Sequence, residues 1–158
     1  MNPSSRHVIM PSAAATTALA ACLANRLVPG DVVLLCGPIG AGKTHFARGL
    51  IQSILTVPED VPSPTFTLVQ TYDTCRGPLW HADLYRLSHP DDIEELGLVE
   101  AMAESICLIE WPDRMGSLCP AAALSLDFAT TPDDDEARDL TLSWERTSWD
   151  GRLAECLP

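Results

Sequence analysis

The sequence predicts an α/β sandwich whose sheet mixes parallel and antiparallel strands. The run DVVLLCG, residues 31–37, contains a continuous apolar stretch, which is typical of a strand buried on both faces of a sheet. A Gly-rich loop follows, and KTHFARGLIQSILT then places Phe46, Leu50 and Ile54 four residues apart on one helix face. Later runs alternate apolar with polar residues, which indicates antiparallel strands. A length of 158 residues suits one domain spanning residues 1–158.

The elements of the first half of the chain are predicted from local signals. RHVIM predicts a short first strand, and a helix follows from about Ser12 to Leu27, ending at PGD. The buried strand, the Gly-rich loop and the amphipathic helix come next. The Pro-rich connector VPEDVPSPTF then leads to two strand-like runs, TFTLVQTYD and PLWHADLYRL, and the TCRGP between them predicts a hairpin.

The second half continues with a short helix over HPDDIEELGL, with Pro90 near its start and Gly97 as its stop. SICLIEW predicts another buried strand. ALSLDFA and DLTLSWER both alternate and predict strands, separated by the acidic loop TTPDDDEA. SWDGRLAECL predicts a closing helix.

The charge balance argues against direct binding of nucleic acid. The chain has 22 acidic and 10 basic residues, with a formal net charge of -12. Because affinity for RNA or DNA comes largely from Lys and Arg on phosphates, we expect any role in a nucleic-acid pathway to pass through a protein partner.

The apolar runs and the cysteines predict a cytoplasmic protein without a membrane span. No apolar run approaches the roughly 20 residues that cross a bilayer, and the N-terminus lacks the charged-then-apolar order of a secretory signal. The six cysteines are at least 12 residues apart, so no close ligand pair predicts zinc. Three of them lie inside apolar runs, where we expect reduced, buried side chains.

The loop GPIGAGKT satisfies the GxxxxGK[ST] pattern of a phosphate-binding P-loop. Its glycines let backbone N–H groups turn toward a β-phosphate, the Lys reaches the β- and γ-phosphate oxygens, and the Thr hydroxyl binds Mg²⁺ at the start of a helix. The predicted nucleotide-binding residues are Gly37, Pro38, Ile39, Gly40, Ala41, Gly42, Lys43 and Thr44.

Lys43 is the only lysine in the chain, and the other nine basic residues are arginines. A compact ammonium on a flexible stem is not replaced by a planar guanidinium where a point charge must reach between phosphate oxygens. The lone lysine therefore strengthens the prediction of a phosphate site.

A P-loop also needs a carboxylate from another strand to hold the metal, directly or through water. Glu110 ends the apolar run ICLIE, and Asp83 ends the weaker apolar run LWHAD. The alternative for Asp83 is an ion pair with Arg86. His81 shares the strand face of Asp83, and a lone His is more often a hydrogen-bonded structural residue.

SPTF, residues 63–66, lies between the P-loop and these carboxylates, where nucleotide switches place a hydroxyl near the γ-phosphate and the metal. The same residues also fit an ordinary turn.

Together, GAGKTHFARGL, SPTFTLVQTY, HADLYRL and ICLIEWPDR, in this order and spacing, resemble the TsaE family (formerly YjeE), over about Met10 to Pro112. The resemblance implies a P-loop NTPase-like three-layer sandwich with a mixed sheet. It also implies binding of ATP with Mg²⁺, slow ATP hydrolysis and an accessory role beside TsaB and TsaD. Those proteins transfer threonylcarbamoyl to the adenosine beside the anticodon of tRNA, so we expect tRNA to be reached only through them.

The family pattern assigns roles to five residues of this sequence. It implies that Lys43 contacts the phosphates, places Thr65 in a switch-like turn and matches Asp83 and Glu110 to the acids of its HxDLYRL and IEWP motifs. These four are the predicted catalytic residues. The predicted metal ligands are Thr44, Asp83 and Glu110.

Other positions are less directly assigned by the resemblance. Trp111 is either an aromatic near the nucleotide or partner, or a core residue. The family usually reads GDLGAGKT, so Pro38 removes a loop acid and one N–H, whereas His45 and Ala82 are packing changes.

Three other functions share a P-loop. A small-molecule kinase usually adds a mobile lid with several arginines, and the only candidates are Arg76 and Arg114 in short connectors. A nucleotide-gated binding module, in which hydrolysis is incidental, is another alternative. A GTPase is disfavoured, because its NKxD motif needs a second lysine.

Overall fold

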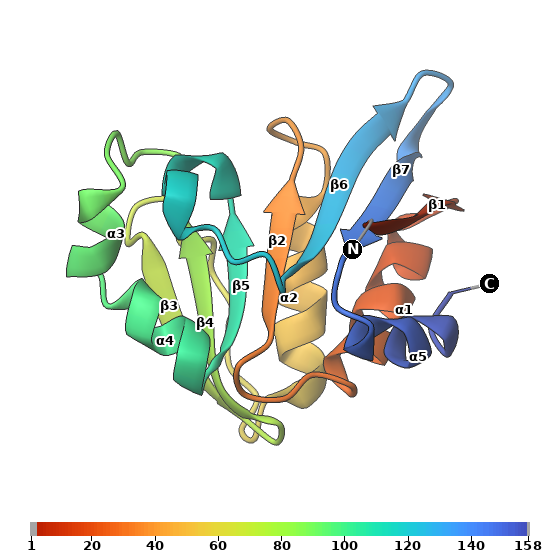
Figure 1. Ribbon diagram of the computed structural model, residues 1–158. Helices are drawn as coiled ribbons and strands as arrows, with labels where there is room; N and C mark the ends of the chain where they lie inside the picture. Colours follow the sequence, from red (N-terminus) through yellow and green to blue (C-terminus); the bar gives the residue numbers. More distant parts are fainter. Residues whose placement is uncertain (1–2, 158) are drawn as a thin grey trace.

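The computed structural model describes residues 3–157, which form one seven-stranded sheet covered by helices (Figure 1). The elements are β1 (Ser4–Met10), α1 (Ala13–Ala24), β2 (Val32–Cys36), α2 (Lys43–Ile54), β3 (Val69–Thr74), β4 (Gly77–Asp83), α3 (Asp91–Glu95), α4 (Leu98–Glu104), β5 (Ile106–Glu110), the 3₁₀ helix η1 (Pro112–Leu118), β6 (Leu124–Thr131), β7 (Asp134–Trp144) and α5 (Ser148–Ala154).

The strand order is β1-β7-β6-β2-β5-β4-β3. The four central strands, β6, β2, β5 and β4, run parallel to one another. β3 adds to one side as the antiparallel hairpin partner of β4, and β7 and β1 add to the other side, also antiparallel. The carboxyl ends of the parallel strands therefore meet along one edge of the sheet, which is where ligands bind in α/β folds.

Each face of the sheet has its own hydrophobic core because successive side chains of β2 point to opposite faces. Val33 and Leu35 pack with α1, α2 and α5 in one cluster. Val32 and Leu34 pack with α3, α4 and η1 in the other. The predicted three-layer sandwich with a mixed sheet is confirmed, including the hairpin of β3 and β4.

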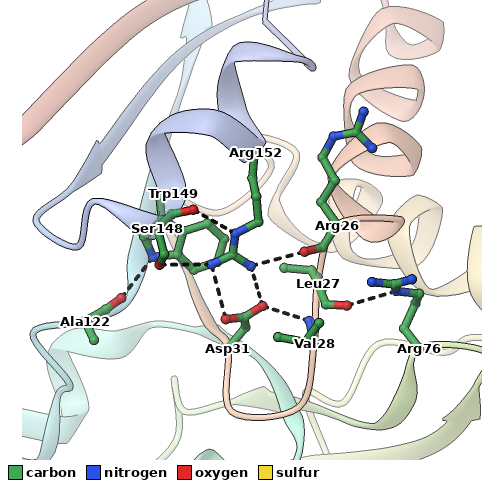
Figure 2. A network of polar contacts seen from close by, with 9 residues as sticks. All are labelled: Arg26, Leu27, Val28, Asp31, Arg76, Ala122, Ser148, Trp149 and Arg152. Carbon is green, nitrogen blue, oxygen red and sulfur yellow. Dashed lines mark hydrogen bonds and ion pairs between the residues drawn. The ribbon is translucent and has the colours of Figure 1, made fainter.

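Helix α5 is held against the loop before β2 by a polar network (Figure 2). Arg152 Nη1 donates to Asp31 Oδ2 at 2.6 Å and to the carbonyl of Arg26 at 3.1 Å. Asp31, which is buried, also accepts the N–H of Val28 at 2.8 Å. The guanidinium of Arg152 stacks on the ring of Trp149, 3.9 Å from its centroid. The buried carboxylate is therefore fully paired, and it anchors the C-terminal helix.

The structure corrects two element boundaries. Gly97, at φ +79°, follows α3 as predicted but also begins α4, a helix that the sequence pattern does not predict. The segment TTPDDDEA, predicted as an acidic loop, is mostly strand, because β6 and β7 continue through it to a turn at Pro132 and Asp133. Asp134 supports the start of β7 by accepting the N–H groups of the second and third residues after it. The longer β7 brings its residues to the edge where the central strands end.

The cysteines also differ from expectation. Cys22 of α1 and Cys156, which follows α5, form a disulfide across 134 positions of sequence. The expectation of reduced cysteines in the apolar runs is therefore wrong for Cys22, since the fold brings it together with Cys156 on one face of the sheet. Cys36, Cys75, Cys107 and Cys119 are free, and burial raises the pKa of Cys107 to about 12.

Within residues 3–157, no helix combines the length and apolar character needed to span a bilayer.

Candidate functional site

The P-loop connects the end of β2 to the start of α2, as predicted. A Cβ at Gly37 would lie 2.4 Å from the carbonyl oxygen of Phe128, so only glycine fits there. Gly42, at φ +110°, begins α2, and no side chain of the described residues caps the helix. The first N–H groups of α2 are therefore left to face a ligand, and such groups favour anions.

Pro38 has a definite place in this loop. Its carbonyl accepts the N–H of Ala41 at 3.2 Å and closes the turn between them. Ala41 is fully buried, and its own carbonyl accepts Nε of Arg138 at 2.9 Å. The N–H of Ala41 is therefore used within the loop, and Ile39, which is 75% exposed, lies at the tip.

Lys43 is buried between the loop and an aromatic ring. Its Nζ donates to the carbonyl of Gly37 at 2.5 Å and lies 3.6 Å from the ring centroid of Trp111. Burial lowers the pKa of Lys43, although the nearby carboxylates of Glu110 and Asp83 act in the opposite direction. The ammonium is thus incompletely compensated, which is the electrostatic condition for attracting a further anion.

The two predicted carboxylates lie side by side. Asp83 is paired in register with Glu110 on the neighbouring parallel strands β4 and β5. Glu110 Oε1 accepts Oγ1 of Thr44 at 2.9 Å, and Asp83 Oδ2 accepts Oγ1 of Thr65 at 3.3 Å. Asp83 Oδ1 accepts the N–H of Tyr85 at 3.0 Å. Both carboxylates are buried and each holds one predicted hydroxyl, so the fold brings all four residues together.

These groups line one cavity of about 710 Å³ at the carboxyl edge of the sheet. Three of the predicted loop residues do not line the cavity: Gly37, Pro38 and Ala41. The predicted residues in the lining are Ile39, Gly40, Gly42, Lys43, Thr44, Thr65, Asp83 and Glu110, and Trp111 joins them. Trp111 adopts φ +60°, a conformation that is costly for a bulky residue and is typical of functional sites.

The arginines of the site differ from those considered in the sequence. Arg76 lies before β4, at the far end of that strand from Asp83, where its Nε donates to the carbonyl of Leu27 at 3.0 Å (Figure 2). Arg86 and Arg138 line the cavity instead. The sequence pattern suggests for Arg86 only an ion pair with Asp83. Arg138 lies 97 residues from its contact in the loop, so no local signal could have identified it.

The donor set at the carboxylates suits Mg²⁺. Among the described residues, no group of three His, Cys, Asp or Glu side chains is placed to hold a metal. Mg²⁺ usually takes only one or two carboxylates, with water and substrate phosphates as its other ligands. The hydroxyl of Thr44 and the carboxylates of Glu110 and Asp83 are hard oxygen donors of this kind, and they face the P-loop within the same cavity.

Comparison with known proteins gives the family. A family model described as "Threonylcarbamoyl adenosine biosynthesis protein TsaE" matches residues 10–140. The chain belongs to the TsaE family. A curated TsaE relative from Rickettsia bellii (strain RML369-C), named "tRNA threonylcarbamoyladenosine biosynthesis protein TsaE", is 38% identical over 133 residues, which is 84% of this chain and 92% of the relative. The TsaE of Bacillus subtilis (strain 168) is 36% identical over 129 residues, which is 81% of this chain and 78% of the relative.

The fold agrees with that of a solved structure. The crystal structure of Bacillus subtilis YdiB matches with a TM-score of 0.77 at 26% identity, covering 99% of this chain and 96% of the other. The resemblance to the TsaE family, and with it a place in tRNA threonylcarbamoyladenosine biosynthesis, is confirmed. The matched segment contains the P-loop, both carboxylates and Arg138.

Proposed function

We propose that the chain binds ATP with Mg²⁺ and hydrolyses it slowly as an accessory protein of tRNA threonylcarbamoyladenosine biosynthesis. One observation carries the proposal: Lys43, the Thr44–Glu110 pair and the Thr65–Asp83 pair converge on one cavity beside the start of α2. Phosphoryl transfer needs little covalent chemistry from the protein, so positioning and electrostatic stabilisation by such a set supply most of the catalysis.

The residues divide the task by their positions. The N–H groups at the start of α2 and the ammonium of Lys43 would hold the phosphates. Thr44, Glu110 and Asp83 would hold Mg²⁺, which neutralises the charge that develops on the phosphates. Thr65 donates to Asp83 and would orient that carboxylate toward the γ-phosphate side.

The partners we propose are TsaB and TsaD, and the proposed compartment is the cytoplasm. A net charge of -12 disfavours direct contact with tRNA. Nucleotide turnover would then act on the partner complex, which itself engages the tRNA.

Reconstitution with TsaB, TsaD and tRNA tests the role. We expect multiple-turnover synthesis of threonylcarbamoyladenosine to fall when this chain is omitted or carries Lys43→Ala. Arg146→Ala, which removes an exposed cation outside the cavity lining, is the matched control and should leave synthesis unchanged. Synthesis that continues at the full rate with Lys43→Ala contradicts the proposal.

Hydrolysis by the isolated chain tests the site. Asp83→Ala and Glu110→Ala should each slow Mg²⁺-dependent ATP hydrolysis strongly, because each change removes roughly several kcal/mol of transition-state stabilisation. Turnover at the wild-type rate in both variants shows that these carboxylates are the wrong ones.

A small-molecule kinase is the second candidate, since two arginines, Arg86 and Arg138, line the cavity. Transfer of the γ-phosphate of labelled ATP to a metabolite, rather than to water, favours it over the accessory ATPase.

A further inference from the structure

We propose that His81 is the residue that positions Glu110, through a single hydrogen bond from its Nε2, for binding of Mg²⁺ with ATP. This inference rests on the proposed function above. His81 lies on β4, two residues before Asp83, and it is completely buried. It does not line the cavity, so it acts through another residue and not on the nucleotide.

The two carboxylate oxygens of Glu110 accept hydrogen bonds from two different side chains. His81 Nε2 lies 2.7 Å from Glu110 Oε2, and Thr44 Oγ1 donates to Glu110 Oε1 at 2.9 Å. Glu110 is only 2% exposed, so water contributes little to its solvation. A buried carboxylate is costly unless it is hydrogen-bonded, and here the two donors fix its plane.

The two ring nitrogens of His81 differ in their contacts. Nδ1 of His81 is buried and has no hydrogen-bond partner among residues 3–157. A carboxylate only accepts hydrogen bonds. The contact with Glu110 therefore needs the proton on Nε2.

The consequence is a carboxylate with only one orientation. Without the Nε2 donor, Glu110 loses a partner on the side away from the cavity, and its carboxylate can rotate off Thr44. Residues that orient metal ligands typically change metal affinity or activity by about 10–100-fold. The phosphate contacts of the P-loop do not involve His81, so binding of ATP alone should not depend on it.

Two substitutions separate this role from a merely structural one. In His81→Gln the side-chain amide places an N–H donor near the position of Nε2. In His81→Asn the shorter amide lies near the position of Nδ1 and does not reach Glu110. Both variants carry a side-chain amide, so a difference in their affinities shows the effect of a hydrogen-bond donor at the position of Nε2.

The measurement is the Kd for ATP by titration calorimetry, once with Mg²⁺ and once with EDTA. We expect the wild type to bind more tightly with Mg²⁺. His81→Asn should bind about 10-fold or more weakly with Mg²⁺, but within about twofold of the wild type in EDTA, and His81→Gln should stay within about threefold in both.

Each other outcome overturns the inference. Unchanged binding of Mg²⁺ with ATP by His81→Asn shows that the contact is dispensable, and an equal loss in EDTA shows a general structural role. If His81→Asn does not fold, the test uses His81→Gln alone. A 10-fold weaker affinity of folded His81→Gln for ATP with Mg²⁺, without a change in EDTA, refutes the donor role. Failure of the wild type to bind ATP at all is distinct from these, because it removes the proposed function itself.

Discussion

The disulfide between Cys22 and Cys156 should stabilise the protein mainly by restricting its unfolded chain. The two residues are 134 positions apart. In the chain-entropy model, closing a loop of this length removes about 17 cal/mol/K from the unfolded state, which is about 5 kcal/mol at 25 °C. Measured disulfides often contribute less, so we expect reduction to lower the free energy of unfolding by about 3–5 kcal/mol. For a domain of this size, Tm should fall by about 10 °C.

Thermal and urea unfolding, followed by circular dichroism with and without dithiothreitol, measure this difference. The double variant Cys22→Ser/Cys156→Ser should unfold like the reduced wild type and should not respond to dithiothreitol. Cys75→Ser, at an exposed free cysteine, is the matched control and should keep the oxidised stability.

Two results would refute the reasoning. One is an equal midpoint for the oxidised and reduced protein. The other is reaction of six thiols, rather than the four free cysteines, when the protein is denatured without reductant.

Three further predictions concern the P-loop and the C-terminal helix. Gly37→Ala should destabilise the fold by about 2 kcal/mol or more, since its Cβ would lie 2.4 Å from the carbonyl oxygen of Phe128, and urea unfolding checks this. Burial lowers the pKa of Lys43 in the free protein, whereas bound phosphates favour its ammonium, so binding takes up a proton. Affinity for ATP should therefore be constant below the pKa of Lys43 in the free protein and fall as pH rises through that pKa. A pH series of Kd values measures this, and a Kd that does not change over the range contradicts the prediction. Arg152→Met should cost about 3 kcal/mol by leaving the buried carboxylate of Asp31 without its ion-pair partner, and adding Asp31→Asn should recover part of the loss in a double-mutant cycle.

The local parts of the site could be predicted because their signals are contiguous in sequence. The strand, loop and helix around Lys43 could be predicted from the spacing of glycines and apolar residues within one short stretch of sequence. Glu110 and Asp83 could be identified because each ends an apolar run, and the ends of parallel strands meet at one edge. These predictions required no knowledge of strand order.

The missed features depend on contacts between distant segments. Arg138 contacts the P-loop because β7 begins at Asp134, before the predicted strand DLTLSWER. Gly37 is restricted to glycine by the carbonyl oxygen of Phe128, which lies on β6. The pairing of Cys22 with Cys156 has no local signal. His81 resembles an ordinary structural histidine in the sequence. Its contact with Glu110 follows from the register of β4 and β5, which pairs His81 with Leu108, two residues before that glutamate.

The place of β1 in the sheet has a consequence for synthesis of the protein. Of the strands in residues 3–157, β1 pairs only with β7, and Ser4 is opposite Trp144. At typical elongation rates of about 5–20 residues per second, the ribosome needs on the order of 10 s to complete β7 after β1 has emerged. Val8 and Met10, which are buried in the final fold, lack their paired strand for that time. Chaperone capture during translation should therefore matter most for this first strand.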